Sequence, residues 1–127
     1  MMLLYATVGT NDLARARAFY DPALAILGYA PIRQNDDEVG YGPTDGEVCR
    51  LWVTRPFDQN AATCGNGSML ALTAGNRAAV DAFHAAALAS GGSDEGKPGL
   101  RYRPHFYACY VRDPDGNKLS AVCETAE

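Results

Sequence analysis

Two residues could carry acid–base chemistry in this chain. His105 is the best titratable group near neutral pH, because an imidazole changes its charge in that range. Tyr5 could donate a proton or a hydrogen bond from the first predicted strand. Both also fit structural roles: a polar residue at a strand edge and a buried tyrosine with a satisfied hydroxyl. His105 and Tyr5 are therefore candidate catalytic residues, and the sequence leaves the choice open.

A second group of residues is suited to holding a small molecule. Arg50 could clamp a carboxylate or a phosphate, and Trp52, on the same face of its strand, could stack on a planar ligand. The competing interpretations are an Arg50 paired with Glu47 or Asp45 and a Trp52 that fills the core. The predicted ligand-binding set is Tyr5, Arg50, Trp52, Met69, Tyr107 and Ser120.

Motifs for other kinds of site are missing. The chain has no G-x-S-x-G nucleophile motif, and Gly65-Asn66-Gly67 precedes a strand and not the helix N-terminus that a phosphate loop uses. The cysteines form no C-x-x-C pair and match no zinc or disulfide spacing, so we expect reduced thiols in a cytoplasmic protein. They are Cys49, Cys64, Cys109 and Cys123.

Composition narrows the classes of partner. The 127 residues suit one domain with a modest core, and 47% hydrophobic and 20% charged residues are ordinary for a soluble globular protein. A net charge of −4 with no basic block argues against nucleic acid and anionic membranes as partners. No apolar run is long enough to span a membrane, and the N-terminus does not have the pattern of a signal peptide.

Periodicity predicts an alternation of strands and helices. Helices are expected from Asn11 or Asp12 to Leu27 and over residues 77–90, with glycine stops. Asp113-Pro114-Asp115-Gly116 is typical of a tight turn, and we expect its two aspartates to serve turn chemistry. Residues 55–67 are predicted to form a linker, and residues 93–104 are predicted to be an irregular stretch. Strands are predicted over residues 3–8, 31–33, 39–42, 48–54, 69–74, 105–111 and 118–123.

The chain also repeats itself. The segment Ala18-Phe19 recurs 64 positions later as Ala82-Phe83, and Asp45-Gly46 recurs 70 positions later as Asp115-Gly116. The first offset pairs Tyr5 with Met69, and the second pairs Arg50 with Ser120. We therefore predict two copies of one unit, module one over about residues 1–54 and module two over about 68–127. Four equivalent inward positions follow, Tyr5, Arg50, Met69 and Ser120.

Several segments resemble the vicinal oxygen chelate superfamily, which includes glyoxalase I, bleomycin and fosfomycin resistance proteins and extradiol dioxygenases. They are residues 7–13, 18–21, 27–29 and 111–119. The resemblance covers nearly the whole chain and implies an α+β fold. Two βαβββ modules would form a curved, partly closed barrel of mixed β-sheet around a cleft, with the helices outside. It also implies a homodimer.

The same resemblance bears on metal binding. In metal-using members, the first strand of each module begins with a His or an equivalent ligand, where this chain has Tyr5 and Met69. Acidic ligands lie on the last strand of a module, where this chain has Arg50 and Ser120. A guanidinium cannot ligate a metal, a thioether is soft, and a Ser hydroxyl is a weak ligand. We therefore expect no divalent metal site and no cofactor.

These observations predict a glyoxalase-like protein that binds a small organic molecule without a metal, and an Arg50 clamp would favour an anionic one. Arg50, Trp52, Tyr5 and Tyr107 would line its cleft. One alternative is a lyase, isomerase or dioxygenase of the same superfamily with an atypical site, or with His105 as its acid–base group. Another is a drug-sequestering protein of the resistance type, for which the acidic net charge is a weak argument.

Overall fold

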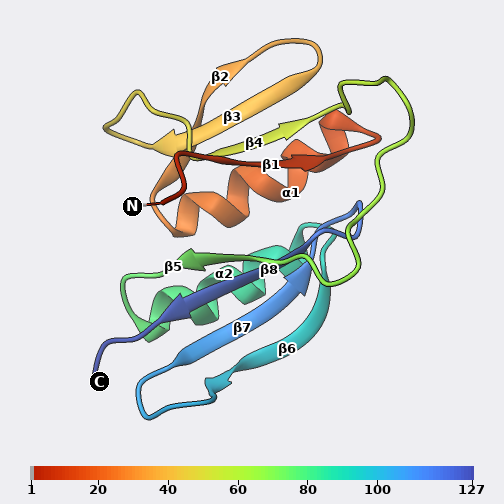
Figure 1. Cartoon of the computed structure of the whole chain (residues 1–127). Helices are drawn as coiled ribbons and strands as arrows, with labels where there is room; N and C mark the ends of the chain where they lie inside the picture. The colour runs from red at the N-terminus through yellow and green to blue at the C-terminus, as the bar shows by residue number, and fades with distance from the viewer. Residues whose placement is uncertain (1) are drawn as a thin grey trace.

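The computed structural model describes residues 2–127 and confirms the α+β fold with two βαβββ modules (Figure 1). Module one contains β1 (Ala6–Gly9), α1 (Leu13–Ile26), β2 (Tyr29–Gln34), β3 (Glu38–Pro43) and β4 (Leu51–Thr54). Module two contains β5 (Leu70–Thr73), α2 (Arg77–Ala89), β6 (Ser93–Leu100), β7 (Tyr107–Arg112) and β8 (Lys118–Cys123).

Each module forms its own four-stranded mixed sheet. The strand orders are β1-β4-β3-β2 and β5-β8-β7-β6, and the first and last strands of each module pair in parallel. No backbone ladder joins the two sheets within residues 2–127, although β1 and β5 are the facing edges. The predicted closure into a barrel is therefore not confirmed.

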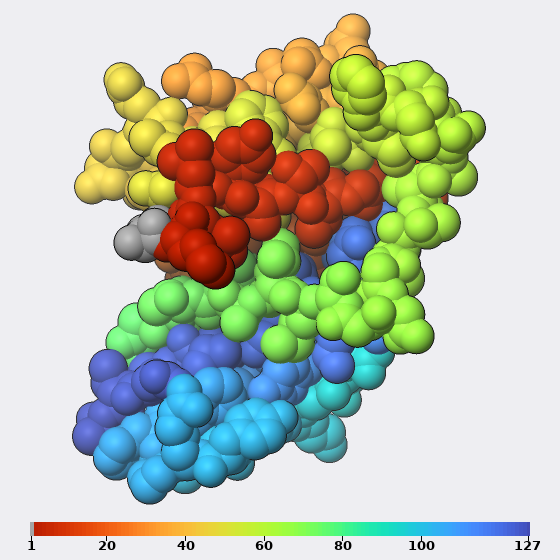
Figure 2. Space-filling view, viewed as in Figure 1, coloured from red at the N-terminus to blue at the C-terminus, as the bar shows by residue number. Residues whose placement is uncertain are grey.

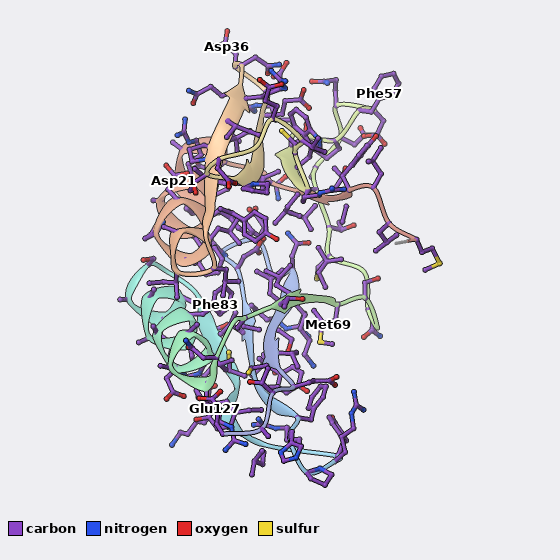
Figure 3. The ribbon with its side chains drawn as sticks, turned by 90° about the vertical axis from the view of Figure 1, so that its left-hand side faces the viewer. Asp21, Asp36, Phe57, Met69, Phe83 and Glu127 are labelled. Atoms are coloured by element: carbon purple, nitrogen blue, oxygen red, sulfur yellow. The ribbon has the colours of Figure 1, made fainter. Side chains whose placement is uncertain are left out.

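The helices hold the two modules together on one side. α1 and α2 pack against each other, and each covers the inner face of its own sheet. In Figure 3 the helices lie on one side of both sheets, while the labelled Met69 lies on the other. We call this second side the open face. Side chains that alternate with the core residues of the strands point toward it.

Capping confirms the helical part of the repeat. The Asp12 side chain accepts a hydrogen bond from the backbone N–H of Arg15 at the start of α1. Asn76, 64 positions after Asp12, accepts one from Ala79 at the start of α2. Both are typical N-cap contacts that satisfy an unpaired helix donor. The two helices are therefore equivalent at the offset that the sequence predicts.

The equivalence predicted for the last strands is wrong by two residues. Ala6 pairs with Leu51 in module one, and Leu70 pairs with Leu119 in module two. The loop between β3 and β4 is two residues longer than the turn between β7 and β8, because Tyr41 faces Leu51 where Val111 faces Leu119. Arg50 therefore corresponds to Lys118, and Ser120 corresponds to Trp52.

Three local predictions also change. The stretch expected to be irregular contains β6, whose Pro98 is tolerated because β6 is an edge strand. The strand expected from residue 48 begins only at Leu51. The strand expected from residue 105 begins only at Tyr107. On α2, His84 is only 8% exposed, and its Nε2 lies 2.9 Å from Asp94 Oδ1.

Candidate functional site

The seam between the modules contains a hollow of about 330 Å³, which we call the apolar hollow. It lies where the start of β1 and the start of β4 face β5, which lines it along its whole length. Figure 2 shows the N-terminal residues directly beside the β5 region on the face turned to the viewer. Its lining residues are Leu3, Leu4, Tyr5, Ala6, Leu24, Tyr29, Tyr41, Arg50, Leu51, Met69, Leu70, Ala71, Leu72 and Thr73.

Among these lining residues, Arg50 supplies the formal charge. Its Nη1 donates a hydrogen bond to the Leu4 carbonyl oxygen over 3.0 Å, which fixes the N-terminal segment beside the start of β4. Tyr41 is fully buried, and its hydroxyl donates to Asp21 Oδ1 over 2.6 Å. Burial and the Asp21 carboxylate raise the pKa of Tyr41 far above its usual range, so this hydroxyl stays protonated.

A second hollow of about 540 Å³, which we call the polar hollow, lies at the other end of the seam. It forms where the end of β1 meets the starts of β5 and β8, beneath the linker. Its lining residues are Thr7, Val8, Gly9, Thr63, Cys64, Gly65, Gly67, Ser68, Met69, Leu70, Asn117 and Lys118. Met69 and Leu70 line both hollows, so the two are neighbours at the start of β5.

The structure brings three of the six predicted ligand-binding residues to one place. Tyr5, Arg50 and Met69 all line the apolar hollow. Trp52 lies on the open face of the same sheet, where its ring packs directly on Gly40. A β-carbon at Gly40 would lie 2.8 Å from that ring, so only glycine allows the contact.

The other predicted site residues lie elsewhere. Ser120 is fully buried beside Ala71 and Tyr110 and lines neither hollow. Tyr107 faces α2, where its hydroxyl donates to Asp81 Oδ1 over 2.6 Å. His105 is exposed in the loop between β6 and β7. Successive side chains of β7 point to opposite faces of the sheet. Because Tyr107 faces α2, Ala108 and Tyr110 point toward the open face.

Comparisons with known proteins identify the family. Residues 3–120 match the model of the glyoxalase/bleomycin resistance protein/dioxygenase superfamily. The chain belongs to this superfamily. A glyoxalase/bleomycin resistance protein from Albidiferax ferrireducens T118 is similar at 39% sequence identity and a TM-score of 0.86, over 96% of this chain and 98% of that one. Among curated proteins, no sequence matches the chain significantly.

More distant superfamily members share the fold. A glyoxalase-related enzyme from Fulvimarina pelagi has 22% identity and a TM-score of 0.73, over 96% of this chain and 88% of that one. Lactoylglutathione lyase from Agrobacterium tumefaciens has 19% identity and a TM-score of 0.64, over 96% and 93%. In the part of the chain that the structure describes, no helix combines the length and apolar character needed to cross a bilayer.

The residues present do not fit the superfamily's divalent metal. The register places Tyr5, Arg50, Met69 and Lys118 at the four repeat-equivalent positions, and two of these side chains are cations that repel a metal ion. Within residues 2–127, no three His, Cys, Asp or Glu side chains come together where they could hold a metal ion. The chemistry available at this seam is therefore apolar contact, hydrogen bonding and positive charge.

Behind the polar hollow, a polar cluster joins the two modules. We call it the carboxylate latch, formed by Thr10, Tyr20, Asp113 and Asp115. The buried Tyr20 hydroxyl donates to Asp113 Oδ2 over 2.5 Å, and the Thr10 hydroxyl donates to Asp115 Oδ2 over 2.6 Å. Asp113 Oδ1 also accepts from the backbone N–H groups of Asp115 and Asn117, which confirms its predicted role in the turn. The contact with module one is a second role that the sequence did not reveal.

Proposed function

We propose that this superfamily member binds a small organic molecule that is largely apolar and carries an anionic group. The molecule would lie in the apolar hollow, with its charge toward Arg50, and no divalent metal would take part. The observation that supports this proposal is the arrangement of one guanidinium in a hollow formed mostly by aliphatic and aromatic side chains.

Size and surface favour a small ligand. Ligand pockets typically measure about 300–1,000 Å³, so a hollow of about 330 Å³ lies at the lower end of that range. Leu3, Leu4 and Tyr5 are exposed by 59%, 63% and 52%, so apolar surface here is in contact with water. A ligand that covers such surface gains about 25 cal/mol for each Å² of apolar area removed from water.

The charge of Arg50 favours an anionic group. A guanidinium stays protonated at all physiological pH values, and its planar set of donors matches a carboxylate or a phosphate. The wall around it reinforces this preference, since no Asp or Glu lines the apolar hollow. Tyr5 and Thr73 add hydroxyl groups that can orient a polar end of the ligand.

Titration with hexanoate and with 1-hexanol, followed by backbone amide NMR, tests the proposal. We expect hexanoate to bind more tightly than 1-hexanol and to shift the amides of residues 3–6 and 70–73. Arg50→Gln should weaken hexanoate about tenfold and leave 1-hexanol unchanged, because a lost charge-assisted hydrogen bond contributes about 1.5–3 kcal/mol. Arg33→Gln, at an exposed arginine of β2 outside both hollows, is the matched control.

Two outcomes would overturn the proposal. One is hexanoate binding that Arg50→Gln does not weaken. The other is a stoichiometric Zn, Ni, Fe or Mn ion in protein purified without chelators, because it would require a site that the residues described above do not form. A catalytic superfamily member using His105 would instead turn over a thiol adduct, an epoxide or a catechol, and His105→Ala would abolish that turnover.

The same purified protein also tests the drug-sequestering alternative and the predicted homodimer. Tight binding of a drug such as bleomycin without product would support a sequestering role. A cytoplasmic homodimer stays a prediction from the family resemblance, and light scattering of the purified chain measures its oligomeric state.

A further inference from the structure

We propose that the polar hollow is a second anion-binding site, formed around Lys118, and that the natural ligand carries an anionic group at each end of an apolar body. This inference rests on the proposed function, since the first anionic group would lie at Arg50. It adds a second binding residue, a second hollow and a ligand class, the elongated organic dianions.

The duplicated register places Lys118 where module one has Arg50. Ala6 pairs with Leu51 and Leu70 pairs with Leu119, so the residues one step earlier are Tyr5 with Arg50 and Met69 with Lys118. The surroundings repeat as well. The apolar hollow combines the starts of β1 and β4 with β5, and the polar hollow combines the starts of β5 and β8 with β1. Each hollow thus has one cation at the start of the last strand of a module. Arg50 directly precedes β4, and Lys118 is the first residue of β8.

The surroundings of Lys118 suit an anion. The polar hollow is lined by no Asp or Glu, and its linker contributes the hydroxyls of Thr63 and Ser68. No ion pair joins Lys118 to a carboxylate among residues 2–127, whereas its cross-strand neighbour Arg112 pairs with Glu95 over 2.5 Å. The Lys118 ammonium lies 5.7 Å from the centre of the Tyr110 ring, which holds the half-buried side chain on the open face.

The two cations line neighbouring hollows that share part of their walls. Met69 and Leu70 line both hollows. Residues 3–5 and Ala6, the first residue of β1, line one, and Thr7, Val8 and Gly9 of β1 line the other. At about 3.3 Å per strand residue, three residues along β1 separate the two hollows by roughly 10 Å. Aliphatic dicarboxylates of medium length have an apolar body and two carboxylates at such a spacing.

Isothermal titration calorimetry with matched acids tests the inference. Adipate, suberate and sebacate are compared with hexanoate, octanoate and decanoate, which have the same carbon counts and one carboxylate fewer. We expect a dicarboxylate of intermediate length to bind about tenfold more tightly than its matching monocarboxylate. Lys118→Gln should remove that difference and leave monocarboxylate binding unchanged, whereas Lys118→Arg should retain it. Lys97→Gln, at an exposed lysine of β6, is the control.

Cys64 supplies a local readout that does not depend on affinity. It is exposed and lines the polar hollow, while Cys49, Cys109 and Cys123 are buried. We expect suberate to slow the alkylation of Cys64 by iodoacetamide several-fold, and octanoate to slow it less. In Lys118→Gln the two acids should protect Cys64 equally.

The outcomes separate this inference from the proposed function. If monocarboxylates bind with the expected dependence on Arg50 but dicarboxylates bind no more tightly, the second site is wrong and the proposed function stands. A dicarboxylate advantage that persists in Lys118→Gln also overturns the inference. If neither kind of acid binds the wild-type protein, both proposals are wrong.

Discussion

The two ends of the seam between the modules are built from equivalent segments but differ in what fills them. At one end Asp113, in the turn after β7, reaches across to Tyr20 on α1. At the other end the equivalent position is Pro43, 70 residues earlier, and His84 occupies the position of Tyr20. Proline has no side-chain acceptor, and His84 turns to Asp94 within its own module. At the first end the carboxylate latch fills the space behind the polar hollow, and at the second end the apolar hollow extends into the seam.

Because of this difference, only one of the two hollows of the duplicated fold reaches the core. Behind the polar hollow, the latch fills the space between the helices and the turn. The apolar hollow has no such filling and extends inward to Leu24 and Tyr41, which belong to the core. The latch also stabilises the seam without lining either hollow, so the residues that hold the modules together differ from those proposed to bind a ligand.

The largest expected effect comes from Asp113→Ala. Asp113 is only 4% exposed, and its loss would leave the buried Tyr20 hydroxyl and two turn N–H groups without their acceptor. We expect the free energy of unfolding to fall by about 2–4 kcal/mol, measured by urea denaturation. Pro43→Ala, at the equivalent position, should cost less than about 1 kcal/mol. Equal effects of the two substitutions would contradict the proposed difference between the two ends.

Tyr20→Phe should have a smaller effect that depends on pH. Burial, followed by the nearby Asp113 carboxylate, raises the pKa of Tyr20 well above the ordinary value of 10.0. Above about pH 10 the unfolded chain releases this proton while the folded chain retains it, so stability falls as pH rises. The variant should lose about 1–2 kcal/mol at pH 7 and show a shallower loss of stability between about pH 9.5 and 11. An unchanged slope in urea denaturation across that range would exclude a protonated Tyr20 in the latch.

Arg15→Gln should have the smallest effect. Arg15 Nη2 lies 2.9 Å from Asp115 Oδ1, but its side chain is 49% exposed, so water and salt screen the pair. We expect a loss of no more than about 0.5 kcal/mol at low ionic strength. This loss should disappear in about 1 M NaCl, where the Debye length is about 3 Å. A larger loss that persists in high salt would place Arg15 among the residues that hold the latch.

Local patterns predicted most of the fold. Helix caps, glycine stops and the Asp113-Pro114-Asp115-Gly116 turn depend on nearby residues, and the structure places the two helices and this turn as expected. The offset of the last strands was wrong because loop length is not visible in an apolar pattern. The latch was missed because its partners lie 93 and 105 positions apart, where no spacing rule applies.

The candidate site was predicted less completely. Tyr5 and Met69 were found because the repeat pairs them at the correct offset, and Arg50 was found from its charge although its repeat partner was wrong. All three line one hollow. The strand parity of Tyr107 was ambiguous in the sequence, and only the packing of α2 on β7 determines which set of side chains faces the helix. Lys118 could have been found by aligning the last strands on their core residues Leu51 and Leu119 instead of on the turns. The residues that precede this pair are Arg50 and Lys118.

The long sequence separation of the carboxylate latch also affects the order in which the chain folds. During synthesis, Tyr20 emerges 93 residues before its acceptor Asp113. The Gly9 carbonyl oxygen emerges 108 residues before the Asn117 amide that donates to it. Contacts of such high order form late, because the loop between them must first be closed. A ribosome-bound chain that ends before Asp113 should therefore hold module one with its polar end still hydrated, and the turn after β7 completes the interface once it has emerged.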